Sequence, residues 1–419
     1  MVLLDIVVME VPAVNAEFNK PLNIKFDHSG NIYVADVNNN VIRKIDGSGT
    51  ITNIVGTGYG AGIGGGGYTG DNGLATAAQL NGPIDLAFDN VGNLYIADNG
   101  NEVIRKVNAS GIITTIAGGG TSGLGDGGPA TAASLYDPLG LVFDSEGNLY
   151  FSDGGHHRVR KISTTGIIST IAGNGVSGYG GDNAAATAAK LVVPGYLAIS
   201  PTGELYIPDW ANYRVRVVNS SGIISTVAGN ASAASSGDGG PATAALVNSP
   251  WAIVFDNSGN YYISSWMSCS IRKVDAAGII TTVVGIDTCG YIGDGGPATA
   301  AKIQEEAICS AVDAGGNLFI ADSRNNRIRR VTYNATAVNQ VNKTLQNVNI
   351  YPNPARNEIT IKSTDKIESV EVVNMWGQVV ASPRPSPKER EMLLDVTFLP
   401  SGVYFVKVNG VYGGKFVKE

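Results

Sequence analysis

The sequence of 419 residues is short of the side chains on which most metal and nucleic-acid sites depend. It has three histidines and three cysteines, and its 29 lysines and arginines are outnumbered by 36 aspartates and glutamates. A net charge of −7 without clustered basic residues argues against nucleic acid as a partner, because such binding requires cations that neutralise phosphates. No apolar run reaches the roughly 18 residues of a membrane-spanning helix, so we expect no transmembrane segment.

Recognisable catalytic motifs are also missing. The sequence contains no Gly-x-Ser-x-Gly nucleophile motif, no Cys-x-x-Cys pair and no His-Glu-x-x-His metal motif. Three histidines, two of them the adjacent His156 and His157, are too few to bring imidazole ligands to a metal ion from several parts of a fold. These absences make an enzyme the less favoured class of protein.

What the chain has instead is glycine, 55 residues of it, and a repeated unit. In Ile84–Gly128 four apolar runs, LAFD, NLYIAD, VIRKV and IITTIAG, are separated by Gly, Asn and Asp turns, a pattern that predicts a four-stranded antiparallel meander. Its FDxxGN turn recurs every 55 to 62 residues, at Asp27, Asp89, Asp144, Ser200, Asp256 and Asp313. Six such units must stack to bury their faces, which predicts an all-β, six-bladed β-propeller with four-stranded blades.

The two ends of the repeat region predict how this ring closes. The sixth copy ends at Val331 without a fourth apolar run, whereas residues 1–10 include the β-branched stretch Val2–Met9. We expect residues 1–10 to supply the outer strand of the last blade and so to cover an otherwise open sheet edge. The propeller would then span residues 1–333, and the polar, aperiodic residues 334–347 would form a linker.

The repeated pattern PxGLAFDxxGNLYIADxxNxRIRKV, followed by GIITTIAG and GDGGPATAA, resembles NHL-repeat proteins over about residues 20–331. The resemblance implies a six-bladed propeller. It implies no single chemistry, because such propellers occur in lyases, hydrolase-like enzymes, sensor ectodomains and binding modules.

Residues 348–419 differ in composition and alternate short strands with turns, which predicts a small β-sandwich. This segment resembles the C-terminal sorting domain of the type IX secretion system of Bacteroidetes. The residues that carry the resemblance are Pro352, Asn353, Pro354, Gly377, Gly402, Tyr404 and Lys415. It implies the type IX machinery as a partner and a protein that is secreted or attached to the outer-membrane surface.

Export of this kind also requires a signal peptide. The first residues, MVLLDIVVMEVP, lack a basic region, and Asp5 and Glu10 interrupt their apolar run. We therefore expect that the given start is truncated and that the signal peptide is missing from this chain.

Two acidic patterns recur. An aspartate precedes an arginine by seven residues in Asp36 and Arg43, Asp98 and Arg105, Asp153 and Arg160, Asp209 and Arg216, and Asp322 and Arg329. We interpret these as structural ion pairs, since a feature repeated around a ring is typical of scaffold; the alternative is an array of ligand-binding charges. In the fifth copy Ser265 replaces the aspartate, so Arg272 needs another partner.

The second acidic pattern is GDxxxATAA in the segments between repeats. We expect its aspartates to cap a short helical turn. The alternative is that carboxylates such as Asp126, Asp238 and Asp294 gather on one face and bind calcium, although each loop offers a single carboxylate. No cofactor is required by the sequence, and calcium is the one ion that it suggests.

The fourth and fifth copies depart most from the pattern. Trp210 and Tyr213 in the fourth copy and Trp266 in the fifth stand at equivalent turns and are candidates for a platform on which a sugar or peptide stacks; ordinary variation of a surface turn is the alternative. Cys289 and Cys309 flank one loop and are the candidate disulfide of an exported protein, which would leave Cys269 free.

These features favour an exported binding or interaction module that recognises an extracellular glycan or protein through the propeller. One alternative is a hydrolase or lyase that acts on a polysaccharide or lactone with a divalent ion in the channel. It is disfavoured because catalysis needs distinct residues from different blades, whereas these repeats are nearly uniform. A further alternative is a structural spacer without a ligand.

Overall fold

The computed structural model describes residues 4–7, 16–61, 65–333, 348–364, 366–374, 379–383, 390–409 and 411–419. The chain divides at residue 334 into two compact units, which are described separately. Within the described residues the helices are single 3₁₀ turns, and none has the length and apolar character needed to cross a membrane. The linker expected at residues 334–347 lies outside the described residues.

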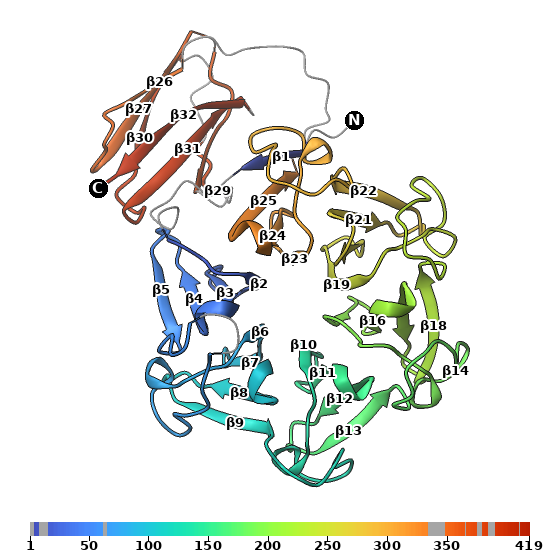
Figure 1. Cartoon of the computed structure of the whole chain (residues 1–419). Helices are drawn as coiled ribbons and strands as arrows, with labels where there is room; N and C mark the ends of the chain where they lie inside the picture. The colour runs from blue at the N-terminus through green and yellow to red at the C-terminus, as the bar shows by residue number, and fades with distance from the viewer. Residues whose placement is uncertain are drawn as a thin grey trace. The chain divides into compact units, whose positions relative to one another are not determined.

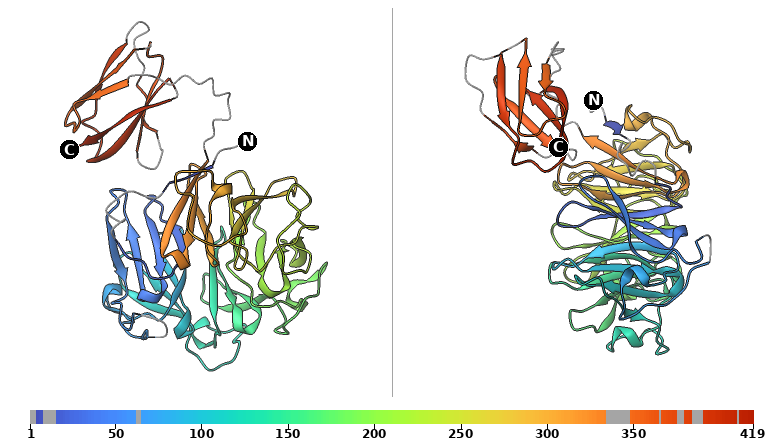
Figure 2. Two further views of the ribbon diagram at one scale, coloured as in Figure 1. Left: turned by 45° about the horizontal axis from the view of Figure 1, so that its top comes forward. Right: turned by 90° about the vertical axis from the view of Figure 1, so that its left-hand side faces the viewer.

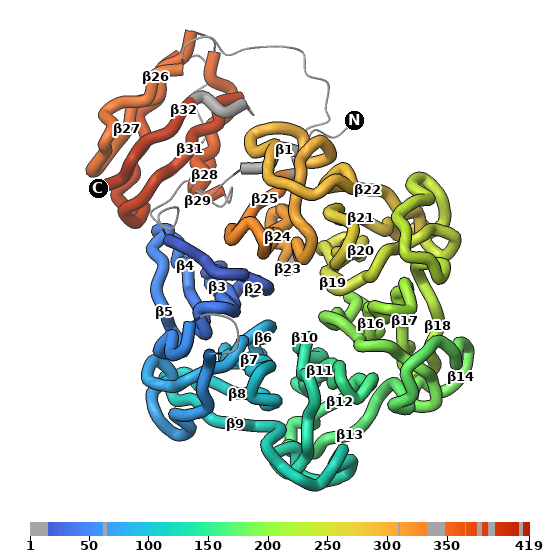
Figure 3. Tube along the Cα trace, viewed as in Figure 1, coloured from blue at the N-terminus to red at the C-terminus, as the bar shows by residue number. Residues whose placement is uncertain are grey.

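In the described part of the first unit, six antiparallel sheets surround a common centre (Figure 1). Apart from the edge strands β1 and β14, the chain completes one sheet before it enters the next, and the first strand of each such four-stranded unit lies nearest the centre (Figure 3). This is the all-β, six-bladed propeller that the repeats predict. Its blades are numbered here in chain order.

The strands of each blade follow from the centre outward. Blade 1 consists of β2 (Pro21–Phe26), β3 (Ile32–Asp36), β4 (Val41–Ile45) and β5 (Ile51–Val55). Blade 2 consists of β6 (Pro83–Phe88), β7 (Leu94–Asp98), β8 (Val103–Val107) and β9 (Ile113–Gly118). Blade 3 consists of β10 (Pro138–Phe143), β11 (Leu149–Asp153), β12 (Arg158–Ile162) and β13 (Ile168–Ala172).

The remaining blades repeat this order. Blade 4 consists of β15 (Ala198–Ile199), β16 (Leu205–Asp209), β17 (Arg214–Val218) and β18 (Ile223–Ala228), with the added edge strand β14 (Ala184–Ala185). Blade 5 consists of β19 (Pro250–Phe255), β20 (Tyr261–Ser265), β21 (Ser270–Val274) and β22 (Ile280–Gly285). Blade 6 consists of β23 (Ala307–Val312), β24 (Leu318–Asp322), β25 (Arg327–Tyr333) and β1 (Leu4–Val7).

The FDxxGN motif forms the turn between the first two strands of a blade. In blade 2, Oδ1 of Asp89 accepts hydrogen bonds from the backbone N–H groups of Val91 and Asn93, and Oδ2 accepts one from the Asn93 side chain. Gly92 has a φ of 88°, a conformation that side-chain-bearing residues rarely adopt. The motif therefore specifies the turn through both its carboxylate and its glycine.

Figure 2 shows the ribbon from two further sides. Aromatic side chains of the repeat join neighbouring blades. The ring of Tyr33 in blade 1 meets that of Phe88 in blade 2 edge to face at 4.8 Å, and Tyr95 meets Phe143 of blade 3 at the same distance. Each such pair contributes about 0.5–1.5 kcal/mol beyond the apolar area that it buries. The repeat thus carries its own contact to the next blade.

Blade 6 is completed by the N-terminal strand. β1 pairs antiparallel with β25 along the outer edge of the sheet, with Leu4 opposite Tyr333 and Val7 opposite Arg330. The last and first blades also meet near the centre, where the rings of Phe319 and Phe26 lie 5.0 Å apart. Strand β1 occupies the position in which the sequence places the closing strand.

The expected disulfide between Cys289 and Cys309 is wrong, because Cys289 is bonded to Cys269. The two Cα atoms lie 5.2 Å apart. Cys269 follows the turn after β20, and the loop that leaves β22 folds back over this turn. In blade 1, Asn40 stands at the position equivalent to Cys269, and its side chain donates to the carbonyls of Tyr59 and Gly60 in the loop that leaves β5. The disulfide therefore replaces a polar contact between turn and loop.

The second unit is a β-sandwich, as the sequence predicts. One sheet consists of β26 (Val348–Tyr351), β27 (Glu358–Ser363) and β30 (Glu391–Asp395), and the other of β29 (Val379–Ala381), β28 (Val370–Asn374), β31 (Gly402–Val408) and β32 (Val411–Lys418). Ile361, Val372 and Phe416 are among the buried side chains that both sheets contribute to the core.

Two of the candidate sorting residues, Asn353 and Tyr404, contact the last strand of this sandwich, on which Lys415 lies. Asn353, between Pro352 and Pro354, accepts the N–H of Val417 and donates to the carbonyl of Lys415. Tyr404, two residues after Gly402, donates its hydroxyl to the Pro400 carbonyl and stacks on Phe416. Gly377 lies outside the described residues.

Deleting residues 1–7 is expected to lower the melting temperature of the propeller by several degrees, because β25 loses its partner strand and exposes an unpaired edge. The measurement is differential scanning calorimetry of the truncated and full chains, with light scattering to detect association through the open edge. A melting temperature unchanged by the deletion would show that β1 is not needed for closure.

Peptide mapping under non-reducing conditions is expected to yield one linked fragment that contains Cys269 and Cys289. Replacing Cys289 by Ser should destabilise the propeller by about 3 kcal/mol, the value for a cross-link that closes a loop of this size. A linked fragment containing Cys309 would contradict the observed pairing.

Candidate binding face

One end of the propeller is formed by two kinds of segment, and we call it the turn face. The first kind is the turn between the second and third strands of each blade, and the second is the segment that leads into each inner strand. Most of these turns form a short 3₁₀ helix. The turn helices are η2 (Val37–Asn39), η4 (Asn99–Asn101), η6 (Gly154–His156), η8 (Trp210–Asn212) and η10 (Ser323–Asn325).

Each of these turns is anchored by the aspartate that ends the second strand. Oδ1 of Asp98 accepts the backbone N–H of Asn81, and Oδ2 accepts the side chain of Asn101 and Nη1 of Arg105 at 3.4 Å. Asp98 and Arg105 are fully buried, and burial raises the pKa of Asp98 to about 6. The carboxylate therefore joins strand, turn and incoming segment at one buried point.

The same ion pair forms in four other blades, at distances of 3.1–3.5 Å. Its members are Asp36 and Arg43, Asp153 and Arg160, Asp209 and Arg216, and Asp322 and Arg329. His156 takes the place of the turn asparagine in blade 3, with its Nδ1 2.9 Å from Asp153. In these five blades the aspartate and the arginine therefore neutralise each other inside the blade.

The aspartates of the GDxxxATAA loops do not cap helical turns, contrary to expectation. The turns η3 (Ala75–Ala77), η5 (Ala130–Ala132), η7 (Ala186–Ala188) and η9 (Ala298–Ala300) have no side-chain cap hydrogen bond. Each loop aspartate instead binds the arginine that lies 34 or 35 residues later. The pairs are Asp71 with Arg105, Asp126 with Arg160, Asp182 with Arg216, Asp238 with Arg272, and Asp294 with Arg329, at 2.5–2.8 Å.

These pairs bear on the calcium alternative. A calcium ion at Asp126, Asp238 or Asp294 would have to displace an arginine from each carboxylate. Among the described residues no three His, Cys, Asp or Glu side chains come together as a metal-binding group. In blade 5, where Ser265 replaces the strand-end aspartate, Arg272 pairs with Asp238.

The two candidate tryptophans, Trp210 and Trp266, both contact a third, Trp251, which the sequence analysis did not predict. Trp251, at the start of the inner strand β19, lies 5.8 Å from Trp210 and 4.6 Å from Trp266 between ring centroids, and 5.9 Å from Tyr196. Trp251 is buried, and Trp210 and Trp266 pack against the same core cluster. Much of the predicted platform is therefore interior packing. Tyr213 follows η8 in the left-handed conformation.

The centre of the propeller is packed rather than open where the inner strands begin. Leu22, Ile84, Leu139, Trp251 and Ile308 come from five blades and are all buried there. The sequence could have shown this ring, since each residue stands one place after the start of its inner strand.

Below this ring lies one buried carboxylate. Asp85 accepts hydrogen bonds from the side chain of Asn23 and from the backbone N–H groups of Leu86 and Leu141, and burial raises its pKa to about 6. Among the described inner-strand residues it is the one carboxylate. The described inner strands therefore do not bring together the acidic pair or triad that would favour the enzyme alternative.

The blades differ most at one equivalent residue, which directly precedes the inner strand in five blades and in blade 4 precedes Pro194, whose backbone bridges to Asp209. This residue has a positive φ of 46–63° in every blade, and it carries a different side chain each time: Lys20, Gly82, Asp137, Val193, Ser249 and Glu306. Left-handed backbone costs on the order of 1 kcal/mol for residues other than glycine. The repeat motifs do not include this position, so they did not predict this ring of variable residues. The signal is present in the sequence, as a residue that changes from repeat to repeat just before each inner strand.

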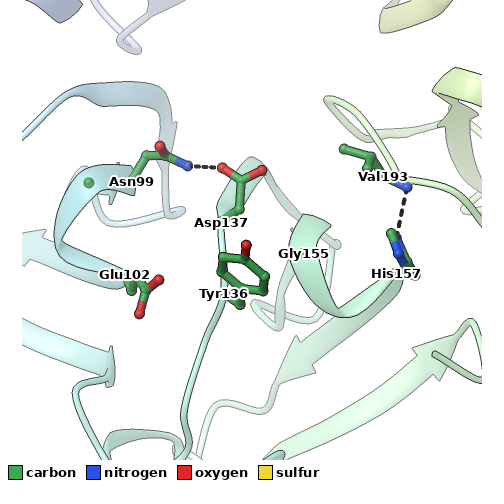
Figure 4. A pocket seen from close by; sticks show the side chains of 8 residues that line it. Asn99, Glu102, Tyr136, Asp137, Gly155, His157 and Val193 are labelled. Atoms are coloured by element: carbon green, nitrogen blue, oxygen red, sulfur yellow. Dashed lines mark hydrogen bonds between the residues drawn. The ribbon is translucent and has the colours of Figure 1, made fainter. Parts of the chain in front are cut away.

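Part of this ring lines a pocket of about 540 Å³ between blades 2, 3 and 4 (Figure 4). Its lining residues are Asn99, Gly100, Glu102, Tyr136, Asp137, Gly155, His157 and Val193. Asn99 donates to Asp137 at 2.5 Å and also to the Pro138 carbonyl. Tyr136 is 55% exposed, so its ring forms an accessible wall of the pocket.

The charge of the pocket comes from its carboxylates. Nδ1 of His157 accepts the N–H of Val193, and burial lowers the pKa of His157, so this ring is neutral at pH 7. Glu102 and Asp137 are the two acidic lining residues, and no lysine or arginine lines the pocket among the described residues. The pocket is therefore anionic and aromatic.

Two stretches of the chain match protein-family models. Residues 349–418 match a secretion system C-terminal sorting domain, and residues 119–178 match the teneurin NHL domain. Human teneurin-1 is 27% identical over 376 residues, which cover 79% of this chain but 13% of teneurin-1. The chain thus spans only a small part of the length of the curated relatives that it matches.

Solved structures share the fold. An auxiliary nutrient binding protein from Bacteroides ovatus has a TM-score of 0.54 at 14% identity, with 79% of this chain and 76% of that chain covered. A second auxiliary nutrient binding protein, from Bacteroides thetaiotaomicron, has a TM-score of 0.54 at 16% identity, with 80% and 76% covered.

Repeats, fold and matches together define an NHL-type β-propeller joined to a secretion sorting domain. The terminal sandwich is the type IX sorting domain that its motifs indicate, and the protein is exported, either secreted or attached to the cell surface.

Replacing Arg105 by Leu is expected to lower the free energy of unfolding of the propeller by about 3–5 kcal/mol, because Asp98 remains buried without its counter-charge. Lys106→Leu is the matched control: Lys106 is the next residue, lies 3.9 Å from Asp89 and is partly exposed, so its loss should cost about 1 kcal/mol or less. Urea unfolding followed by fluorescence measures both. Equal losses would contradict the structural weight given to the buried pair.

Proposed function

We propose that this protein is an exported binding module that captures an extracellular protein or glycan through the turn face of its propeller. The observation that carries the proposal is the contrast between uniform blades and a variable ring at the turn face. Binding surfaces need differing side chains on a rigid support, and this ring supplies charged, polar and apolar residues at equivalent positions.

Two further observations support this proposal. The pocket beside Tyr136 offers a concave surface with an accessible ring and several polar groups, a combination typical of binding sites. Two structures with the same fold are described as auxiliary nutrient binding proteins, so a binding role is one that this kind of propeller supports.

The hydrolase or lyase alternative has less support. Asp85 is enclosed by three hydrogen-bond donors, and the side chain of Lys25 lies 4.0 Å away. Catalysis of hydrolysis or elimination requires an acid and a base that reach the substrate, and Asp85 is buried. The spacer alternative explains the uniform blades but not the variable ring.

The test is a binding screen of the full chain against arrayed glycans and extracellular proteins, followed by titration calorimetry on each hit. Tyr136→Ala and Met267→Ala change exposed residues at separate places on the turn face, and Val91→Ala changes an exposed residue in a turn at the opposite end of blade 2. A ligand of the turn face should lose about fivefold or more in affinity with at least one of the first two variants, and none with Val91→Ala.

Two results would contradict the proposal. A screen without any saturable ligand would favour the spacer. Turnover of a polysaccharide or lactone by the full chain would favour the enzyme.

A further inference from the structure

The pocket at blades 2, 3 and 4 is rich in hydrogen-bond acceptors. In the described residues the Glu102 carboxylate forms no side-chain hydrogen bond or ion pair, and Asp137 uses one of its oxygens for Asn99. Asn99 spends its N–H groups on Asp137 and Pro138, so its own carbonyl oxygen remains available. The free capacity of the pocket thus lies mainly in oxygen acceptors, two of them on anions.

The ring of Tyr136 is seated in a specific way. A Cβ atom on Gly155 would lie 2.1 Å from this ring, so only glycine lets the turn η6 pass behind it. One side of the ring therefore packs on backbone while more than half of the side chain remains exposed. Figure 4 shows Glu102, Tyr136 and Asp137 gathered on one side of the pocket, with His157 and Val193 on the other.

Resting on the proposed binding function, we propose that this pocket receives the basic side chain, arginine or lysine, of a protein ligand. The charged head binds between the carboxylates of Glu102 and Asp137, and the aliphatic stem lies along the ring of Tyr136 and the side chain of Val193.

The hydrogen-bond donors and acceptors that line the pocket favour a basic side chain over a sugar. A guanidinium or ammonium group only donates, whereas a sugar hydroxyl both donates and accepts. In this pocket the Tyr136 hydroxyl and Nε2 of neutral His157 are the side-chain donors, so hydroxyl groups would find few partners for their oxygens. A cation additionally interacts with the face of an aromatic ring.

The electrostatic setting agrees with this choice. On the other side of the turn face, Glu306 is paired with Lys20 at 3.0 Å and with Arg324 at 3.0 Å, so that acidic group is already neutralised. Glu102 and Asp137 have no such cation in the described structure. Together with the net charge of −7, this leaves the two carboxylates of the pocket available to attract a positively charged ligand.

The test uses the full chain and three blocked tripeptides that differ in one side chain. Acetyl-Gly-Arg-Gly-amide carries the cation, acetyl-Gly-Lys-Gly-amide carries it on a different head group, and acetyl-Gly-citrulline-Gly-amide has the shape of the first without the charge. Saturation-transfer NMR titration gives the three dissociation constants. We expect the arginine and lysine peptides to bind and the citrulline peptide to bind about fivefold more weakly or not at all.

Variants locate the site. Glu102→Gln removes the charge of an exposed side chain and should weaken the arginine peptide about two- to fivefold, the range for a partly exposed ion pair. Tyr136→Ala should weaken it by a similar factor through loss of the ring contact. Glu146→Gln is the matched control, because Glu146 is an exposed residue in the turn at the opposite end of blade 3. Thermal melts of each variant check that the propeller is intact.

Three outcomes would overturn the inference: equal affinity for the arginine and citrulline peptides, binding unchanged by Glu102→Gln, or capture of glucosamine oligomers at this pocket without the basic peptides. The proposed function fails separately. A screen ligand that binds the turn face with an affinity unchanged by Glu102→Gln supports the binding module and refutes the role of this pocket. Charge-dependent peptide binding without any screen ligand supports the pocket and counts against the proposed function.

Discussion

The structure depends on a guanidinium group buried between two carboxylates. Arg105 has no exposed surface, and its charge is met by Asp98 at the end of the second strand and by Asp71 in the preceding loop. Removing a charge from water costs several kcal/mol unless partners surround it. The arginine therefore forces strand end, third strand and incoming loop into one arrangement, and the repetition of this arrangement from blade to blade explains why the repeats are so alike.

Blades 1 and 5 each lack one of the two carboxylates around the buried arginine. In blade 1 the segment before the first strand carries no GDxxxATAA loop, and Arg43 turns instead to the carbonyl of Glu17 and the ring of Phe18. In blade 5 the strand-end aspartate is Ser265, and Arg272 keeps Asp238 and the Leu246 carbonyl. A blade tolerates the loss of one carboxylate when backbone oxygens or a ring complete the shell around the guanidinium.

Sequence patterns predicted more of the fold than of the candidate binding site. Repeat spacing predicted the blades, and the incomplete sixth copy predicted the position of β1. The partner of Arg272 was also readable, since Asp238 stands 34 residues before it as Asp126 stands before Arg160. The pairing of Cys269 was not readable, because it depends on a loop that folds back over a turn, and sequence distance says nothing about that path.

The scaffold and the pocket are connected through one carboxylate. Asp153 binds Arg160 and His156, and it also accepts the backbone N–H of Tyr136. The same buried charge that holds blade 3 together thus positions the ring that walls the pocket, and the next residue, Asp137, is left to vary. Because surface charges are screened beyond about 8 Å at physiological salt, the anionic pocket and the neutralised Glu306 side act locally. A ligand that spans the turn face would therefore meet distinct chemistry at its two ends.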